Sequence, residues 1–263
     1  MTTDASIEEA ADRLERAART GVACAPLTGL LTAGDIDAAY QVQQRLTERR
    51  LAGGARIVGR KIGLTSQAVQ RQIGVDRPDF GVLFDDMRYD DGAEIPISRL
   101  LQPKAEAEVA FLLASDIDDA SDPAVVRAAV GLAFPALEIV DSRIADWKIA
   151  IADTVADNAS SGVFVLGATG TPIDAVEPRE VTMTMRRGDT VVSQGAGRDC
   201  LGDPLRALAW LAETAIGVGA PLRAGDLVLS GALGPMADIR PGDAFEAEIA
   251  PLGTVAARFS GKD

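Results

Sequence analysis

Residues 100–113 read LLQPKAEAEVAFLL and predict a buried strand that carries two carboxylates. Side chains alternate faces along a strand and rise about 3.3 Å per residue, so Glu106 and Glu108 should share one face roughly 6 to 7 Å apart. The VAFLL that follows is apolar on both faces, which indicates a central strand with dry neighbours. Because burying two unpaired carboxylates is costly, a positive group is expected between them.

Two kinds of positive group fit this spacing, and the spacing alone leaves both open. The glutamates could pair with Arg or Lys in a structural network, or they could hold a hard divalent cation such as Mg²⁺ or Mn²⁺. A third carboxylate favours the cation: GLAFPALEIVDSRI (131–144) predicts a second buried strand whose one acid before the turn is Glu138. Pro135 would mark a bend or an edge there, and Asp141 and Arg143 could orient the carboxylates or bind a substrate carboxylate.

The composition excludes several classes of function. The 263 residues include 26 Lys and Arg against 39 Asp and Glu, a net charge of −13, which argues against nucleic-acid and anionic-membrane partners. Histidine is absent, which excludes Ser-His-Asp and Cys-His catalysis and His-ligated zinc. Proton chemistry must therefore use carboxylates, Lys, Tyr, Cys or water, and a metal site must be mostly lined by oxygen.

Targeting and redox signals are few. The acidic start MTTDASIEEAADRLERA does not resemble a signal peptide, and no apolar run approaches the roughly 18 residues of a membrane helix. The two cysteines, Cys24 and Cys200, have no metal-like or redox-like spacing, so we expect no disulfide. A cytoplasmic location is the simplest expectation.

Periodicity predicts an α+β fold with a helical N-terminal segment, residues 1–55, before a β-rich domain, residues 56–263, and we expect the two to form one continuous unit. The predicted helices are 5–19, 35–54 with Asp35 as its cap and Gly53 and Gly54 at its end, and 203–219 with Asp203 as its cap and Pro204 in its first turn. The predicted strands are 56–63, 93–97, 105–113, 130–139, 162–166, 180–186, 189–194, 226–230, 244–249 and 254–259. Too few helices separate the strands for a doubly wound or eight-fold barrel fold.

Two short motifs have ordinary structural interpretations. The RGD at 187–189 lies between two predicted strands and indicates a hairpin turn. GAGRDC (195–200) begins like a dinucleotide-binding loop, but Cys200 stands where that motif requires Gly, and no βαβ unit follows. We interpret it as a loop.

Lysine is rare, so each of the four lysines is informative. Lys61 lies in IVGRKIGLTS (57–66) between Gly59 and Gly63, which permit close approach of a ligand or another backbone. If desolvated there, Lys61 would have a lowered pKa and act as acid or base, or would hold an anion. The alternative is a surface lysine whose ammonium reaches solvent.

Five blocks occur in an order that is far more specific than any one motif: 59–87, which contains KIGLTS and RPDFG, then QPKAEAEVAFLL (102–113), ALEIVDSRI (136–144), DTVADNASSGVFVLG (153–167) and DLVLSGALGP (226–235). Together they resemble the 2-hydroxypenta-2,4-dienoate (2-oxopent-4-enoate) hydratases of the fumarylacetoacetate hydrolase superfamily. The likeness begins near residue 35, and the first 34 residues show no match.

The resemblance implies a mixed-sheet roll, a homo-oligomer, and a metal-dependent hydratase that forms 4-hydroxy-2-oxopentanoate or an alkyl homologue. It implies Mg²⁺ or Mn²⁺ on Glu106, Glu108 and Glu138. By the same resemblance, Lys61, Asp79 and Ser161 lie near the substrate. We expect Lys61 and Asp79 to be the proton carriers, with a carboxylate or metal-bound water as the alternative base, and Leu64, Thr65 and Ser161 to bind substrate.

Two alternatives remain. The related 4-oxalocrotonate decarboxylases share the metal site, although they tend to carry a KMGFT-like segment and to lack PDFG. A non-catalytic scaffold partner of such a decarboxylase is the other, and the hydratase itself could associate with a pathway decarboxylase or aldolase.

Overall fold

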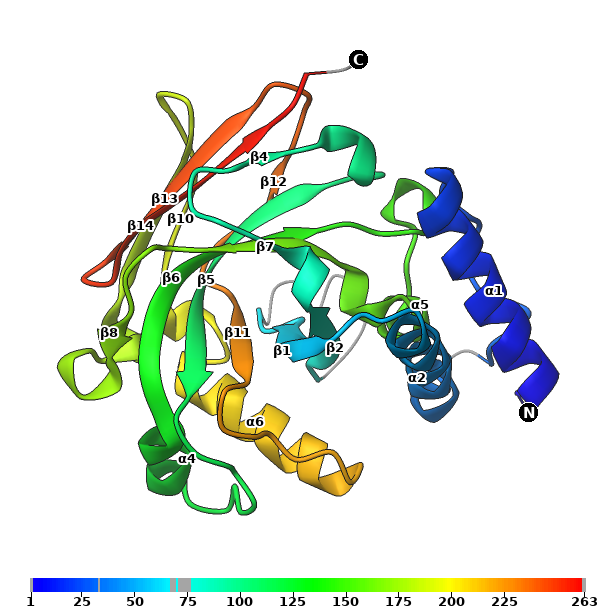
Figure 1. The fold of residues 1–263 in the computed structure, drawn as a ribbon, viewed down its shortest axis with the longest axis horizontal. Coiled ribbons are helices and arrows are strands. Elements are labelled where there is room, and N and C mark those ends of the chain that lie inside the picture. The colour runs from blue at the N-terminus through cyan, green and yellow to red at the C-terminus, as the bar shows by residue number, and fades with distance from the viewer. Residues whose placement is uncertain (1, 33, 67–69, 71–76, 262–263) are drawn as a thin grey trace.

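A computed structural model of the chain describes residues 2–32, 34–66, 70 and 77–261 (Figure 1). Its α-helices are α1 (Asp4–Thr20), α2 (Ile36–Ala52), α4 (Pro123–Ala129), α5 (Ile151–Ala156) and α6 (Pro204–Gly217). Its strands are β1 (Ile57–Gly63), β2 (Asp79–Phe84), β3 (Arg88–Tyr89), β4 (Glu94–Ile95), β5 (Lys104–Leu113), β6 (Val130–Val140), β7 (Ser161–Leu166), β8 (Thr171–Pro172), β9 (Thr182–Arg187), β10 (Thr190–Ala196), β11 (Leu227–Ala232), β12 (Ala237–Asp238), β13 (Ala244–Ala250) and β14 (Gly253–Phe259).

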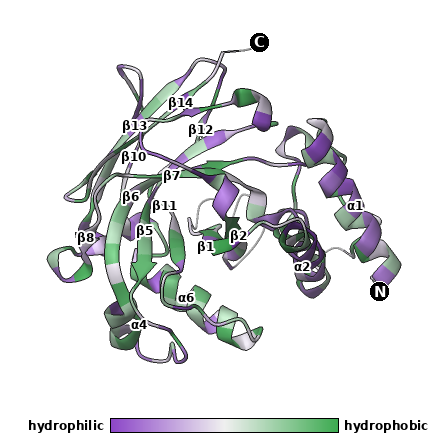
Figure 2. Cartoon of the chain, in the orientation of Figure 1, coloured by the Kyte–Doolittle hydropathy of each residue, from purple (hydrophilic) through white to green (hydrophobic). Residues whose placement is uncertain are grey.

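The larger sheet has the order β2-β1-β11-β5-β6-β7-β3, with β12 added to β5 and β8 added to β6. It is mixed, because β1 pairs with β11 in parallel whereas β5 runs antiparallel to both β11 and β6. Strand β5, which contains Glu106 and Glu108, is therefore a central strand, as its apolar VAFLL sequence predicts. Figure 2 shows the hydrophobic colouring concentrated on these inner strands.

The smaller sheet has the order β10-β9-β13-β14-β4 and packs across β5 and β6 through β13 and β14. Buried and exposed residues alternate along β13, so one face of this sheet meets the core and the other meets solvent. Helix α6 packs against β1 and β11. The two sheets and α6 enclose one continuous apolar core, which confirms the predicted mixed-sheet α+β fold.

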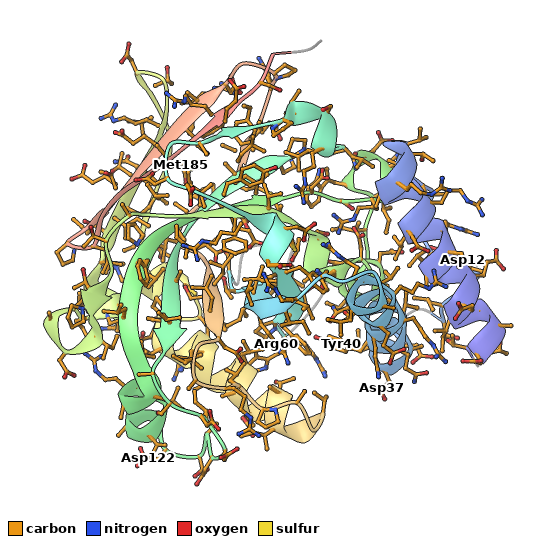
Figure 3. The ribbon with its side chains drawn as sticks, in the orientation of Figure 1. Asp12, Asp37, Tyr40, Arg60, Asp122 and Met185 are labelled. Carbon is orange, nitrogen blue, oxygen red and sulfur yellow. The ribbon has the colours of Figure 1, made fainter. Side chains whose placement is uncertain are left out.

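The N-terminal helices form a second apolar cluster with α5, and side chains of α2 hold β2. Gln43 donates from Nε2 to the carbonyls of Phe80 and Val155, both at 2.9 Å. The Tyr40 ring stacks on Phe80 with centroids 4.7 Å apart, and Figure 3 labels Tyr40 on α2 beside β2. Residues near the start of the chain therefore help to place β2.

Most predicted elements are confirmed. The three predicted helices correspond to α1, α2 and α6, and each predicted strand overlaps an observed strand. Asp35 caps α2 and Asp203 caps α6 by accepting backbone N–H groups, and the RGD tripeptide forms the turn between β9 and β10. Cys24 and Cys200 are free.

The main omission is β2, which carries Asp79. All six of its residues are buried, so it lacks the alternation that marks a strand in sequence. The short strand predicted at 93–97 is also shorter than expected, because a 3₁₀ turn begins at Ile97 directly after Pro96.

Pro135 lies inside β6, but neither neighbouring strand on one side pairs with it, which fits the predicted local edge. The neighbour of β6 on one side changes there: β8 pairs with Leu132 and Ala133, and β7 pairs from Ala136 onward. The missing N–H of proline is therefore tolerated.

Candidate metal centre and active-site cavity

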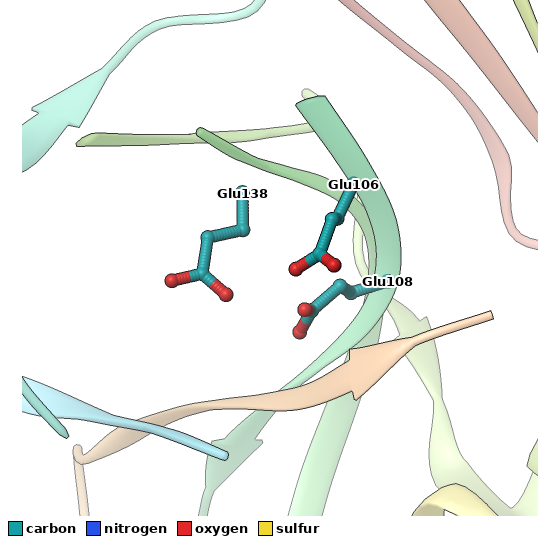
Figure 4. Close-up of side chains that lie close together, drawn as sticks. All are labelled: Glu106, Glu108 and Glu138. Atoms are coloured by element: carbon teal, nitrogen blue, oxygen red, sulfur yellow. The ribbon is translucent and has the colours of Figure 1, made fainter. Parts of the chain in front are cut away.

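The three predicted glutamates meet on one face of the β5–β6 pair (Figure 4). Glu106 and Glu138 are directly opposite each other in the antiparallel register, and Glu108 lies two residues along β5 on the same face. Each offers a carboxylate oxygen, and these oxygens all lie within 4.8 Å of one another. Glu108 and Glu138 are fully buried, and Glu106 is partly exposed.

The hydrogen bonds of this cluster are incomplete. Glu108 Oε2 accepts the Gly231 N–H at 2.7 Å, and Lys61 Nζ lies 3.1 Å from Glu138 Oε1. Among the residues that the structure describes, neither Glu108 Oε1 nor Glu138 Oε2 has a hydrogen-bond donor. Buried carboxylate oxygens without donors are suited to a cation, and an all-oxygen set suits a hard divalent ion, so the residues fit a metal.

Lys61 lies on β1 beside the glutamates and is only 2% exposed. A Cβ at Gly59 would lie 1.8 Å from the Leu227 carbonyl oxygen, so this glycine permits close approach of β11. A Cβ at Gly63 would lie 2.2 Å from Asp79 Oδ1 and 3.4 Å from Lys61 Nζ. The second glycine therefore leaves room at the site, and the surface-lysine alternative is wrong.

The predicted lowered pKa of Lys61 is also wrong. Burial alone lowers the pKa, but the carboxylates of Glu138, Asp79, Glu106 and Glu108 outweigh it and raise the pKa above its ordinary value. In the metal-free protein the protonated form of Lys61 is therefore favoured, and its ammonium can hold an anion.

Asp79 lies beside Lys61, at the start of β2 and opposite Gly63 in the sheet. Its Oδ2 accepts a hydrogen bond from Thr154 Oγ1 at 3.1 Å, and Thr154 Oγ1 lies 3.4 Å from Ser160 Oγ. Its Oδ1 has no donor among the described residues. Burial raises the pKa of Asp79, and the charge of Lys61 and the Thr154 hydrogen bond oppose that rise only in part.

Glu106, Lys61 and Asp79 line a cavity of about 100 Å³, the glutamate or inner cavity, and Glu106 also lines an adjoining outer cavity of about 800 Å³. Leu64 and Thr65, the predicted substrate contacts, line the inner cavity, and Leu64 has a left-handed backbone with φ of 57°. The remaining inner wall is largely apolar: Val140, Trp147, Ile149, Ala159, Ala232 and Met236.

The structure places Ser161 elsewhere. Ser161 lines a neighbouring cavity of about 300 Å³ together with Asp141 and Arg143, and Ser160 lines the glutamate cavity. Asp141 accepts the backbone N–H groups of residues 101 and 102, and Arg143 pairs with Asp157. Asp141 and Arg143 therefore contact protein groups, and neither lines the glutamate cavity.

Sequence reasoning missed Thr154 and Ser160. Both fall within the DTVADNASSGVFVLG block, but hydroxyl side chains are common at helix ends and turns, so no local signal separates them from ordinary capping residues. The register of α5 against β2 brings Thr154 to Asp79, and long-range packing of this kind is not visible in a single sequence.

Crowding of the carboxylates predicts an unusual pH dependence for the metal-free protein. Burial and then the charge of Glu138 raise the pKa of Glu106 from 4.5 to about 7. The folded state then binds more protons than the unfolded state between these values, so the free energy of unfolding should fall as pH rises, by up to about 1.4 kcal/mol per pH unit for one such group. Urea unfolding in EDTA should show lower stability at pH 7.5 than at pH 5.5.

Two controls separate this effect from other titrations. Saturating Mg²⁺ favours the charged carboxylates and should reduce the slope, and Glu106→Gln should remove part of it in EDTA. An unchanged slope in both would contradict the assignment.

Comparisons with known proteins place the chain in a family. A family model described as fumarylacetoacetate (FAA) hydrolase C-terminal matches residues 59–260. The chain is 50% identical over 256 residues to the TodF product hydratase of Pseudomonas putida, covering 97% of this chain and 96% of that protein. It is 52% identical over 253 residues to a 2-keto-4-pentenoate hydratase of Paraburkholderia xenovorans, covering 96% and 94%.

A solved structure has the same fold as this chain. The 4-oxalocrotonate decarboxylase of Pseudomonas putida G7, in complex with magnesium and adipate, superposes with a TM-score of 0.94 at 32% identity, covering 98% of this chain and 99% of that one. The alignments with the hydratases extend over nearly the whole chain, so the expectation that the first 34 residues lack a match is wrong. The chain belongs to the fumarylacetoacetate hydrolase family.

Proposed function

We propose that the chain is a metal-dependent hydro-lyase that adds water to 2-hydroxypenta-2,4-dienoate, or an alkyl homologue, to give 4-hydroxy-2-oxopentanoate in meta-cleavage catabolism. The observation that carries the proposal is full-length identity of about 50% to relatives named as hydratases, joined to a cavity lined by Lys61, Asp79 and one glutamate of the carboxylate cluster. The substrate is an anion, which a protein with a net charge of −13 would otherwise repel. Lys61 supplies a positive charge at the site.

Glu106, Glu108 and Glu138 are the proposed metal ligands, and Mg²⁺ or Mn²⁺ is the proposed ion. Magnesium is present in the decarboxylase structure, which supports the choice of a hard ion. When bound, such an ion would polarise the 2-oxygen of the substrate and offset its carboxylate charge.

Asp79 and Lys61 have different proposed roles in the proton transfers, because their charge states differ. In the first stage the dienol loses its enol proton and gains a proton at C5, which gives a 2-oxo-3-enoate. In the second stage the oxygen of water bonds to C4, C3 gains a proton, and the remaining water proton is released. Asp79, with a raised pKa and one oxygen that lacks a donor among the described residues, is the proposed proton carrier, whereas the Lys61 ammonium holds the substrate anion.

We propose Ser160, in place of Ser161, as the serine beside the substrate. Ser160 Oγ can hydrogen-bond Thr154 Oγ1, which in turn donates to Asp79 Oδ2. Leu64 and Thr65 remain proposed substrate contacts because they line the same cavity.

The shape of the wall favours a hydratase over a decarboxylase. The decarboxylase substrate carries a second carboxylate. Arg198 and Arg206 line the outer cavity, whereas within the described part of the chain Lys61 is the only cationic side chain that lines the inner one. The apolar wall suits a hydrocarbon tail instead. The similarity in fold to the decarboxylase keeps that activity as the second candidate.

One assay separates the candidates. Purified protein with Mg²⁺ and freshly generated 2-hydroxypenta-2,4-dienoate should consume the dienol absorbance and yield 4-hydroxy-2-oxopentanoate. Release of CO₂ from an oxalocrotonate, without hydration of the dienoate, would establish the decarboxylase. Inactivity on both would favour the scaffold, although a scaffold has no need to retain Lys61, Asp79 and three glutamates together.

Assembly and location remain proposals from the family likeness. We expect a homo-oligomer, able to associate with a decarboxylase or aldolase of the same catabolic route, in the cytoplasm. Size-exclusion chromatography with light scattering tests the assembly. Within the described residues, the search for a helix long and apolar enough to cross a bilayer finds none.

Thr154→Val tests the proposed proton carrier. Valine keeps the shape of threonine but removes the hydrogen bond to Asp79 Oδ2, and that bond lowers the pKa of Asp79. The limb of the kcat–pH profile that Asp79 sets should therefore move to higher pH. A limb that stays in place would remove Asp79 from that step.

A further inference from the structure

The turn that carries Ser160 has a strained backbone. Asn158, Ala159 and Ser160 have φ values of 54°, 51° and 51°, the left-handed region that is unfavourable for a residue with a side chain. None of the three is glycine, so the surroundings must impose the conformation. Strain of this kind is found where the fold needs a group at one place.

Arg143 holds this turn from outside the glutamate cavity. Its guanidinium donates to Asp157 Oδ1 at 2.5 Å, to the Asp157 carbonyl at 2.6 Å and to the Ser161 carbonyl at 2.7 Å. These acceptors flank the three left-handed residues on both sides. The planar fork of arginine satisfies all three at once from three different nitrogens, whereas lysine carries all of its donors on one nitrogen.

The side of the turn opposite Arg143 contacts β2. Asn158 accepts the Val82 N–H at Oδ1 and donates from Nδ2 to the Val82 carbonyl, at 2.7 and 2.9 Å. A Cβ at Gly81 would lie 2.4 Å from the Asn158 carbonyl oxygen, so only glycine permits this approach. Gly81 is opposite Lys61 in the sheet and two residues from Asp79, so the turn is fixed to the strand that carries the proton carrier.

We propose that Arg143, with Asp157, is a positioning pair: it holds the left-handed turn so that Ser160 meets Thr154 and the hydroxyl pair orients Asp79. Neither Arg143 nor Asp157 lines the glutamate cavity. A buried ion pair is weak support for stability by itself, so its use here is to impose geometry. The role in catalysis rests on the proposed hydratase function, whereas the role in holding the turn does not.

Arg143→Lys is the principal test, because lysine keeps the positive charge but lacks the planar guanidinium that donates to all three acceptors. We expect kcat for the dienoate to fall about 10- to 100-fold with KM changed less than about 3-fold, since misplacement of a catalytic group mainly affects the chemical step. The kcat–pH limb should move in the same direction as in Thr154→Val. Hydrogen–deuterium exchange over residues 157–161 should also increase.

Arg127→Lys is the matched control. Arg127 also donates to two backbone carbonyls, those of Ile173 and Val176, and pairs with Glu177, but it does not line the glutamate cavity. Its kcat and pH profile should match the wild type. If Arg143→Lys does not fold, Gly81→Ala displaces the turn from the other side without a change of charge and should show the same loss of kcat.

The outcomes separate the two proposals. Wild-type protein that does not hydrate the dienoate contradicts the proposed function, and increased exchange in Arg143→Lys would still support the held turn. Active wild type with unchanged kcat and unchanged exchange in Arg143→Lys overturns the positioning role. A fall in kcat of the same size in Arg127→Lys overturns it as well, because the effect would then be general loss of structure.

Discussion

Glu108→Gln is expected to reduce hydratase activity at least about 10³-fold, because loss of a metal ligand removes several kcal/mol of transition-state stabilisation. The substitution should leave the fold intact. The glutamine carbonyl can accept the Gly231 N–H that Glu108 Oε2 accepts, and its amide can donate to the carboxylates of Glu106 and Glu138.

The same variant should be more stable than wild type when metal is absent. Burial raises the pKa of Glu108 well above its ordinary value, and the nearby carboxylates of Glu138 and Glu106 raise it further, so the charged form is unfavourable in the folded state. A neutral glutamine removes that cost. At pH 8 in EDTA the Tm of Glu108→Gln should therefore exceed that of wild type. Added Mg²⁺ should raise the Tm of wild type by more than it raises the Tm of the variant.

Calorimetric titration with Mg²⁺ and Mn²⁺ completes this test, and Glu246→Gln is its control. Glu246 is exposed on β13, so its substitution removes one carboxylate and should leave activity and metal affinity unchanged. Full activity of Glu108→Gln, or of exhaustively chelated wild type, would contradict the metal site.

The carboxylate site was predictable from sequence because it is encoded by strand geometry. Alternation places Glu106 and Glu108 on one face, and a second apolar strand with a lone acid supplies Glu138, so only the pairing of β5 with β6 had to be assumed. The pairing that forms puts Glu106 directly opposite Glu138. The ordered blocks also identified the family and the fold.

The charge state of Lys61 was not predictable, because burial and neighbouring carboxylates act on its pKa in opposite directions. Only the packed structure shows that the carboxylates prevail. The hydroxyl pair at Asp79 and the left-handed turn were hidden for a similar reason, since they depend on contacts between β2, α5 and the start of β7. The division of the chain at residue 55 stays a prediction.

Asp79→Asn is expected to lower kcat by about 10²- to 10⁴-fold, the usual contribution of a general acid or base. Asparagine can still accept the Thr154 hydrogen bond at its carbonyl, so the local packing should persist. Because Asp79 is not one of the clustered metal ligands, Mg²⁺ affinity should stay close to that of wild type. Steady-state kinetics with calorimetric metal titration measures both effects on one sample.

Asp153→Asn is the matched control for this substitution. Asp153 is also a buried aspartate, but its carboxylate accepts the Leu27 and Ala150 N–H groups and does not line the glutamate cavity. Its substitution should lower Tm while kcat stays close to wild type. If Asp79→Asn keeps kcat within about 3-fold of wild type, the proton must come from another group, and Lys61 or a water molecule would then have to be the carrier in spite of the raised lysine pKa.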